Sequence, residues 1–337
     1  MKALLKFFVF AALAVLLAAC GSNGGVSSVS GSAENASASP EASPVASPAE
    51  SQTPEAAGTK TITYLDQEYE VPASTERIVI AGAIEAMEDA IVLDVHPAGA
   101  ISVGGVFPDM FASITDQAKP IGEKMEPDFE AILALKPDVI LGSSKFKPEV
   151  TEQLQKIATV IPYSHIATNW EANLRLLAEL SGKTEEAEQE IAQYKADLES
   201  AKAKLGEELK DKRIVAVRVR QGDVYVYPVG VFFNPVLYGD LGLAPPAEVA
   251  AAKAQEAISI EKLAEMNPDV MFIQFSPDEN TEAPKALEEL QSNPILSGTN
   301  AFKNGQAYVN VVDPLAQGGT AYSKIEFLKA FVEKLGE

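Results

Sequence analysis

Residues 129–140 are FEAILALKPDVI, and residues 260–271 are IEKLAEMNPDVM. The two stretches start 131 residues apart and share Glu, Pro, Asp and Val at matching places, with apolar residues at the start, middle and end of both. Each is typical of a helix that a Pro-containing break ends, followed by a buried parallel strand. The residues that precede the copies, Asp128 and Ser259, are good helix N-caps.

This repeat predicts the fold class. A helix-strand unit that returns at such a distance indicates two similar α/β lobes, each with a parallel-rich sheet flanked by helices. Two lobes leave a cleft between them, and clefts are where proteins usually bind small molecules. The chain of 337 residues is long enough for two such lobes.

The N-terminus has the features of an export signal with a lipid-attachment site. Lys2 and Lys6 precede and enter an apolar run that is too short to span a bilayer, and the run ends with LAAC at residues 17–20. This end resembles a bacterial lipoprotein processing site, so we expect residues 1–19 to be a signal peptide and Cys20 to carry lipid. The alternative is an incidental cysteine after a generic signal.

The segment after Cys20 is expected to tether the folded body. Residues 20–58 are rich in Ser, Ala and Pro and cannot bury a core, which predicts a disordered linker. More than one acyl chain on Cys20 would hold the protein stably on a membrane. Cys20 is the single cysteine of the chain, so no intramolecular disulfide is possible.

The acidic balance of the chain excludes some partners. It has 48 Asp and Glu against 27 Lys and Arg, a formal net charge of −21. This charge argues against nucleic acid and against electrostatic docking on anionic lipid, although ordinary solvation also explains an acidic surface. Any basic residue in the cleft is therefore informative.

The first lobe is predicted over residues 59–182. Thr168 and Glu171 have the spacing of a capping box at the start of a helix that carries Trp170. The strands expected in this lobe are Arg77–Ala81, Val139–Gly142 and Thr159–Tyr163, and the other helices are Ile84–Leu93, Phe129–Leu135 and Pro148–Ile157.

A long helix is predicted between the lobes, over residues 183–206. Apolar residues recur at alternating spacings of four and three from Ala187 to Leu205, acidic residues occupy the first turn, and Gly206 stands where the helix should stop. The second lobe is predicted over residues 207–337. Its expected strands are Ile214–Arg220, Val224–Tyr227, Val270–Phe275 and Ala307–Val312, and Ser323–Leu335 is its closing helix.

Several stretches in this order resemble a known family, the substrate-binding lipoproteins of ABC importers for iron–siderophore complexes and cobalamin. They are Arg77-Ile78-Val79, Ile121-Gly122, Asn169-Trp170-Glu171, Gly239–Leu243, Ala257–Leu263, Asp313-Pro314-Leu315 and Gly318-Gly319-Thr320. The resemblance covers roughly residues 60–335. It implies two Rossmann-like lobes joined by one long helix, a small hinge motion and no enzymatic activity.

The resemblance also implies a docking role for Glu130 and Glu261. In the family, one acidic residue on each lobe meets arginines of the two permease subunits, and these two residues occupy the same place in the two repeat copies. Two charges far apart on one body fix orientation and accelerate encounter. The alternative is that each Glu simply favours the dipole of its own helix from the first turn.

Candidate ligand-binding residues follow presumed strands. Arg218 and Arg220 lie two apart at the end of a strand and share a face, where guanidinium groups could donate to an oxygen-rich chelate. The alternative is a solvated pair at a sheet edge. Tyr225 could cover the chelate or pack in the core. Further candidates are Lys145, Phe107, Phe232 and Gln317, each in a loop or just after a predicted strand.

The predicted ligand is a chelated Fe(III) siderophore, with a hydroxamate or citrate-hydroxamate type favoured, and no cofactor. We expect a monomer, anchored by lipid to the extracytoplasmic face of a Gram-positive cell membrane, that delivers the complex to an ABC permease with a cytoplasmic ATPase. The same fold could instead bind haem or a corrinoid, and a protein of another class, a surface adhesin or scaffold without a small ligand, remains an alternative.

Direct metal capture and catalysis have little support in the sequence. The chain has two histidines, whereas sites for bare Zn²⁺ or Mn²⁺ usually need clusters of His and carboxylate. We found no nucleophile elbow, phosphate-binding Walker loop or dinucleotide-binding glycine fingerprint. We therefore expect no direct metal ligands and no catalytic residues.

Overall fold

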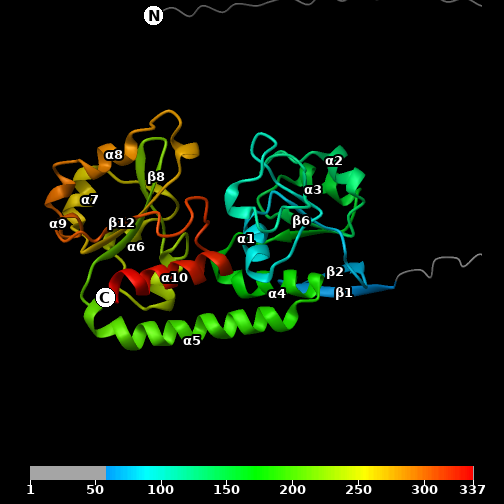
Figure 1. The fold of residues 1–337 in the computed structure, drawn as a ribbon, viewed down its shortest axis with the longest axis horizontal. Coiled ribbons are helices and arrows are strands. Elements are labelled where there is room, and N and C mark those ends of the chain that lie inside the picture. Colours follow the sequence, from blue (N-terminus) through cyan, green and yellow to red (C-terminus); the bar gives the residue numbers. More distant parts are fainter. Residues whose placement is uncertain (1–57, 337) are drawn as a thin grey trace, which may run out of the picture. The chain divides into compact units, whose positions relative to one another are not determined.

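The computed structural model describes residues 58–336, so the predicted signal peptide, Cys20 and almost all of the predicted tether lie outside the described residues. Within 58–336, no helix combines the length and the apolar character that crossing a membrane requires. The described part of the chain forms two α/β lobes above one long helix (Figure 1).

The first lobe is built on a five-stranded parallel sheet in the order β5-β4-β3-β6-β7. An antiparallel hairpin that the sequence analysis missed, β1 (Thr59–Tyr64) with β2 (Gln67–Pro72), precedes the sheet. The sheet strands are β3 (Ile78–Ala81), β4 (Gly99–Ala100), β5 (Lys119–Pro120), β6 (Val139–Ser143) and β7 (Val160–Tyr163). The helices are α1 (Ile84–Leu93), α2 (Phe129–Leu135), α3 (Pro148–Gln155) and α4 (Trp170–Ser181), with 3-10 turns η1 (Asp109–Phe111) and η2 (Ala167–Asn169).

The second lobe holds a mixed five-stranded sheet in the order β10-β9-β8-β11-β12. The strands are β8 (Ile214–Arg220), β9 (Asp223–Val226), β10 (Glu256–Ala257), β11 (Val270–Phe275) and β12 (Ala307–Val309), with β8, β11 and β12 parallel. The helices are α6 (Ala247–Ala251), α7 (Ile260–Met266), α8 (Ala286–Gln291), α9 (Asn300–Lys303) and α10 (Ala321–Leu335), with the π-helix η3 (Pro235–Asp240) and 3-10 turns η4 (Pro277–Asn280) and η5 (Leu296–Gly298).

The repeat occupies the same place in both lobes, as the sequence predicts. α2 leads into β6 beside β3, the first strand of its sheet, and α7 leads into β11 beside β8 in the same way. The repeated aspartates explain why the motif recurs, because Asp138 accepts the backbone N–H of Arg77 at 2.8 Å and Asp269 accepts that of Arg213 at 2.8 Å. Each aspartate therefore fastens its strand to the start of the neighbouring one.

The connecting helix α5 (Thr184–Leu209) runs along both lobes (Figure 1). It is about 39 Å long at 1.5 Å per residue. The predicted stop at Gly206 is wrong, since the helix continues for three residues and Leu209 is buried at its end. Packing of Leu209 outweighs the weak helix preference of one glycine, which has no left-handed backbone angle here.

Several other predicted boundaries also differ by a few residues, and three differences at element ends have a visible cause. The Thr168–Glu171 capping box does not form: η2 leads into α4, whose N-cap Asn169 makes no side-chain cap, and the Glu171 carboxylate binds Lys195 and Arg175 instead. α10 begins two residues before the expected Ser323, where Thr320 accepts a hydrogen bond from the Ser323 N–H as the N-cap. β12 ends at Val309 because Asn310 adopts a positive φ of 47°.

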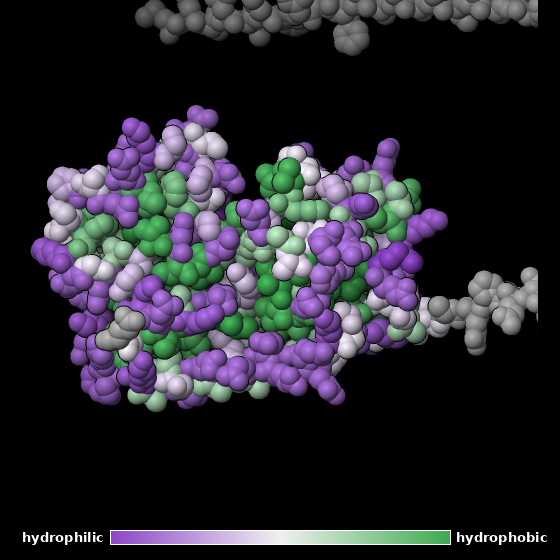
Figure 2. Space-filling view, viewed as in Figure 1, coloured by the Kyte–Doolittle hydropathy of each residue, from purple (hydrophilic) through white to green (hydrophobic). Residues whose placement is uncertain are grey.

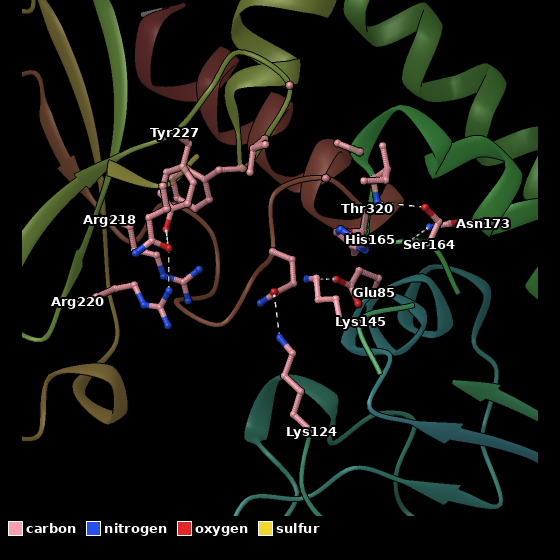
Figure 3. A pocket seen from close by; sticks show the side chains of 18 of the residues that line it. Glu85, Lys124, Lys145, Ser164, His165, Asn173, Arg218, Arg220, Tyr227 and Thr320 are labelled. Atoms are coloured by element: carbon pink, nitrogen blue, oxygen red, sulfur yellow. Dashed lines mark hydrogen bonds and ion pairs between the residues drawn. The ribbon is translucent and has the colours of Figure 1, made fainter. Parts of the chain in front are cut away.

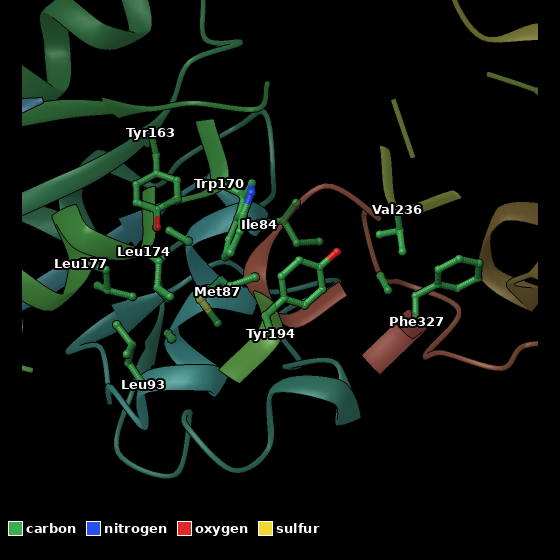
Figure 4. Close-up of a cluster of buried hydrophobic side chains, with 14 of the residues drawn as sticks. Ile84, Met87, Leu93, Tyr163, Trp170, Leu174, Leu177, Tyr194, Val236 and Phe327 are labelled. Atoms are coloured by element: carbon green, nitrogen blue, oxygen red, sulfur yellow. The ribbon is translucent and has the colours of Figure 1, made fainter. Parts of the chain in front are cut away.

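One apolar cluster spans the region between the lobes (Figure 4). It joins Met87 of α1 and Trp170 of α4 to Tyr194 of α5 and Phe327 of α10. Trp170 and Tyr194 meet edge to face with ring centroids 5.3 Å apart. The floor beneath the two lobes is therefore continuous and apolar. The polar side chains between the lobes lie above this floor.

Candidate ligand-binding cleft

A cavity of about 390 Å³ lies between the lobes. The space-filling view shows the surface hollowed at this place, between the two upper parts of the molecule (Figure 2). Its lining residues come from both lobes: Glu85, Lys124, Lys145, Ser164, His165, Ile166, Ala167, Asn173, Arg218, Arg220, Tyr227, Gly230, Val231, Phe232, Gln255, Glu279, Gln317, Gly319 and Thr320.

The wall from the second lobe carries two arginines at the carboxyl end of β8. Arg218 is buried and its Nε donates to Glu279 Oε2 at 2.8 Å, while Arg220 Nε lies 3.3 Å from Glu279 Oε1. Alternation along the strand places both arginines on one face (Figure 3). One carboxylate thus orients two guanidinium groups through their Nε atoms.

Glu279 is itself held firmly in the turn η4. The Asn280 side chain donates to Val219 O at 2.9 Å and to Ser276 O at 2.8 Å, and the Gln221 N–H donates to Glu279 O at 3.0 Å. The turn is therefore fastened to the end of β8 by one side-chain and one backbone hydrogen bond. This arrangement fixes where the arginine tips lie before any ligand arrives.

Gln255 extends the polar surface of the same wall. Its Oε1 accepts from Arg220 Nη1 at 2.9 Å and from the Tyr227 hydroxyl at 3.2 Å. The Tyr227 ring packs against Phe232, with centroids 4.7 Å apart. Aromatic surface and hydrogen-bond donors therefore lie side by side in this wall.

The wall from the first lobe carries two lysines. Lys145, in the loop after β6, places its Nζ 3.2 Å from the buried carboxylate of Glu85. Lys124, in the turn before α2, points into the cavity, and its Nζ lies 3.4 Å from Gln317 Oε1 of the C-terminal segment (Figure 3). Burial lowers the pKa of Lys124.

His165 adds a neutral imidazole beside Lys145. The His165 backbone N–H donates to the Ser144 hydroxyl at 3.2 Å, and the same hydroxyl lies 2.8 Å from His165 Nδ1. Burial and the neighbouring Lys145 lower the pKa of His165, so the ring is neutral near pH 7.

The cavity is positively charged although the chain is strongly acidic. Within the described residues, four lysine and arginine side chains line it against two carboxylates, Glu85 and Glu279. The chain as a whole has a formal net charge of −21. Low-dielectric walls strengthen the field of the unbalanced cations on a bound group, so the cleft favours an anion rich in oxygen acceptors.

Five of the predicted ligand residues line this cavity, namely Lys145, Arg218, Arg220, Phe232 and Gln317. Phe107 and Tyr225 are not among the lining residues, because both rings are partly buried against the apolar cluster. Tyr225 lies opposite Arg218 within the sheet, whereas Tyr227, beyond the end of β9, reaches the cavity. Contact between any of these residues and a ligand stays a prediction.

The sequence analysis missed Lys124, His165, Gln255 and the two carboxylates of the cavity. Lys124 follows the Ile121-Gly122 pair after a strand and is a rare cation in an acidic chain, so it could have been singled out. Gln255 carried no signal, since it lies in a loop that only the folded chain brings beside Arg220.

The two repeat glutamates lie away from the cavity. Glu130 and Glu261 are exposed in the first turns of α2 and α7, whose N-caps Asp128 and Ser259 accept backbone N–H groups as predicted.

Within residues 58–336, no group of three or more His, Cys, Asp and Glu side chains is arranged to hold a metal ion.

Comparison with known proteins identifies the family. The sequence profile described as periplasmic binding protein matches residues 88–310. The chain belongs to this family. It is a binding protein and not an enzyme, and the predicted two-lobe α/β architecture is confirmed.

The iron-uptake system-binding protein FeuA from Bacillus subtilis is similar to this chain both in sequence and in structure. The iron-uptake system-binding protein of strain 168 is 54% identical over 290 residues, which are 85% of this chain and 92% of the relative. A crystal structure of FeuA, named a triscatecholate siderophore-binding protein and complexed with ferri-bacillibactin, is 56% identical with a TM-score of 0.77 and covers 82% of this chain and 98% of that one.

A more distant relative carries a lipoprotein name. The probable siderophore-binding lipoprotein YfiY of the same organism is 29% identical over 248 residues, which are 71% of this chain and 75% of the relative.

Proposed function

We propose that this chain binds a ferric siderophore of the triscatecholate class in the cleft between its lobes. The observation that carries the proposal is the convergence of Lys124 and Lys145 from one lobe with Arg218 and Arg220 from the other around one cavity. Three catecholates around Fe(III) leave a complex with a threefold negative charge and six acceptor oxygens, which suits these donors.

Charge separates this class from the neutral trishydroxamates among the chelates that the sequence analysis favoured. A ferric trishydroxamate is electrically neutral, so it would leave the surplus cations of the cavity uncompensated. The ferri-bacillibactin complex of the 56% identical FeuA supports the same choice. The preference for a hydroxamate or citrate-based chelate remains an untested prediction that we replace here by the triscatecholate.

The test is a titration of the protein with ferri-bacillibactin, in which the fluorescence of Trp170 reports binding. This ring lies in the apolar floor against Tyr194 of α5, where it can report motion between the lobes. We expect saturable binding that weakens with salt, because charged contacts dominate. A neutral ferric trishydroxamate of similar size should bind at least about tenfold more weakly, ~1.4 kcal/mol.

The other outcomes point to the remaining alternatives. Saturable binding of haem or cobalamin with no response to ferri-bacillibactin would replace the siderophore by one of those ligands. Folded protein that binds none of the probes would favour the adhesin or scaffold.

Delivery to an ABC importer is the second part of the proposal. Glu130 and Glu261 lie at matching places of the two lobes and are both exposed, so each can meet a basic side chain of a permease subunit. Exposed charges of this kind steer association and set orientation more than they add affinity.

Lipid anchoring through Cys20 on the extracytoplasmic face of the membrane is the third part. It is supported by the LAAC sequence at residues 17–20 and by the lipoprotein name of one relative. Mass spectrometry of the N-terminal peptide from membranes should show an acylated Cys20, and the Cys20→Ala variant should leave the membrane fraction. Unmodified peptide that starts at Met1 would contradict it.

A further inference from the structure

Two carboxylates of α1 are fully buried at the place where the C-terminal segment crosses to the first lobe. Glu88 and Asp89 have no exposed surface. Charged side chains are rarely buried unless several donors satisfy them. The groups that bind these two are therefore informative about what the pair does.

All donors to Glu88 belong to residues 317–323. The Gln317 N–H donates to Oε1 at 2.8 Å, and the hydroxyls of Thr320 and Ser323 donate to Oε2. An ionised carboxylate can only accept, so both hydroxyls donate to it, while the Thr320 oxygen accepts from the Ser323 N–H and the Ser323 oxygen from the Gly318 N–H. An ionised Glu88 therefore accepts three hydrogen bonds from one short segment.

Asp89 binds the same region one residue further along. Its Oδ1 accepts the Ala321 N–H at 3.0 Å, at the first residue of α10, and its Oδ2 accepts the Tyr163 hydroxyl at 2.7 Å. The first N–H groups of a helix have no partner inside it, so Asp89 satisfies one of them at the start of α10. The pair thus fastens the start of α10 to the first lobe.

The fastened segment is part of the cavity wall. Gln317, Gly319 and Thr320 line the cavity, and the Gln317 side chain meets Lys124. The segment has little room to shift, because a Cβ on Gly318 would lie 2.3 Å from the Phe232 backbone and one on Gly319 would lie 2.7 Å from Ala167 Cβ.

The other end of the segment is tied to the second lobe. The Gln274 amide of β11 donates to Asp313 O and to Ala316 O, both at 3.1 Å. The wall is therefore held by Gln274 on one side and by Glu88 on the other.

From these contacts we propose that Glu88 is a positioning residue for ligand binding, whose ionised carboxylate holds residues 317–320 in the cleft wall. Asp89 supports it by fixing the start of α10. The ligand part of this inference rests on the proposed function, whereas the hold on the wall does not.

The proposal implies a pH dependence. The titratable and charged groups around Glu88 are Glu85 and Asp89 of α1, Lys124, and Tyr322 of α10. Lys145 is paired to Glu85, and the Tyr163 hydroxyl is bound to Asp89. Burial raises the pKa of Glu88 to about 7 against the lowering effect of its hydrogen bonds. Protonation converts one oxygen of the Glu88 carboxylate from an acceptor into an O–H donor, and the groups that face it are donors too. The hold on the wall should therefore weaken as the pH falls below about 7.

The experiment compares wild type with Glu88→Gln and Ser323→Ala, using ferri-bacillibactin between pH 6 and 9. At pH 8 we expect about tenfold weaker binding by Glu88→Gln and a several-fold loss in Ser323→Ala, which removes one donor without lining the cavity. The difference between wild type and Glu88→Gln should shrink toward pH 6. The control Leu263→Ala, buried in the core beneath α7, should lose stability and keep its affinity.

A second readout does not need the ligand. Hydrogen exchange at the Gln317 and Ala321 amides should be faster in Glu88→Gln than in wild type by at least about tenfold. Equal exchange, or equal affinity at pH 8 with folded protein, would overturn the positioning role. Failure of wild type itself to bind, with the exchange difference intact, would instead reject the proposed ligand and leave the hold on the wall standing.

Discussion

Arg218 illustrates how a charged side chain can be buried in this cleft without being lost to the ligand. The Nε atoms of Arg218 and Arg220 both bind the Glu279 carboxylate. This shared counter-charge holds the terminal nitrogens of the two guanidinium groups in place. A planar guanidinium can bind the carboxylate along one edge and a ligand along another, which a lysine ammonium cannot do. Arginine is therefore required here for its shape as well as its charge.

The first prediction follows from this geometry. Arg218→Lys keeps the charge but loses the second edge, so affinity for ferri-bacillibactin should fall at least about tenfold, ~1.4 kcal/mol, in calorimetric titrations. Arg213→Lys is the matched control, because Arg213 precedes the same strand at its other end and is half exposed. Unchanged affinity in Arg218→Lys would remove Arg218 from the site.

The buried pair of α1 gives a second prediction, on stability. Burial raises the pKa of Glu88 from its ordinary 4.5 to about 7 and also raises that of Asp89. The folded state therefore binds protons more tightly than the unfolded state, and this contribution to the free energy of unfolding is present below about pH 4.5 and lost as the pH rises through about 7. Urea denaturation should show wild type losing stability relative to Glu88→Gln over that range. A difference that does not vary with pH would contradict the raised pKa.

At this scale the sequence predicted part of the cleft. The two arginines were found because alternation along one strand fixes a shared face, which needs no knowledge of distant residues. Glu88 was not found, because it occupies a helix whose apolar pattern predicts burial but not which donors meet it. Those donors follow more than 220 residues later, from Gln317 onward.

Among the elements, the helix ends show where local sequence decides and where packing does. α4 ends at Gly182, which has the left-handed φ of 75° that glycine adopts at no cost. Gly206 lies inside α5, with open space around the position of a Cβ. The same residue type therefore stops one helix and is tolerated within another.

The third prediction is that replacing these two glycines by alanine changes the stability of the protein in opposite directions. Gly206→Ala should stabilise the protein by about 0.5–1 kcal/mol, because alanine prefers the helix interior and meets no neighbour there. Gly182→Ala should destabilise it by about 1 kcal/mol through the strained left-handed backbone. Chemical denaturation measures both, and destabilisation by Gly206→Ala would show that α5 is not regular at that point.

Four elements meet at Lys324. Its Nζ lies 2.5 Å from Asp240 Oδ2 of η3 and about 5.5 Å from the ring centres of Trp170 in α4 and Tyr194 in α5. The Tyr194 hydroxyl donates to the same carboxylate at 2.6 Å. Burial lowers the pKa of Lys324, and Asp240 opposes that effect. This cluster stiffens the joint where α10, α5 and α4 come together.

The fourth prediction tests that joint. Lys324→Met keeps the stem but leaves Asp240 without its cation, and since Asp240 is partly exposed the expected cost is about 2–3 kcal/mol. Lys329→Met, on an exposed face of the same helix, should change stability by less than about 0.5 kcal/mol. Adding Asp240→Asn should recover part of the loss, and a Lys324→Met variant as stable as wild type would show that the pair is not needed.

For the whole molecule, the repeat in the sequence was sufficient to predict two lobes and a cleft. Its Pro-Asp pair recurs because each aspartate joins two neighbouring strands in the same manner, so the motif carries the sheet topology with it. Within the described residues, three of the four cations of the cleft were predicted, but not that they face one cavity. That arrangement arises because the end of β8 and loops of the first lobe come together through α5 and the crossing segment before α10.

The last prediction concerns the molecule as a partner of a permease. Glu130 and Glu261 are exposed at equivalent places of two lobes that α5 joins, so they act as a pair only if both lobes are engaged at once. The double variant Glu130→Lys with Glu261→Lys should abolish uptake of ferri-bacillibactin by cells and leave its affinity within about twofold. Each single reversal should reduce uptake in part, because one correct contact still steers encounter.

The matched control reverses two charges elsewhere. Glu185→Lys with Glu186→Lys changes two exposed first-turn residues of α5, so it alters the net charge by the same amount and also acts at a helix N-terminus. This control should transport normally. If both double variants fail equally, the effect belongs to net charge, and if both transport normally, Glu130 and Glu261 are not docking residues and their first-turn position serves only α2 and α7.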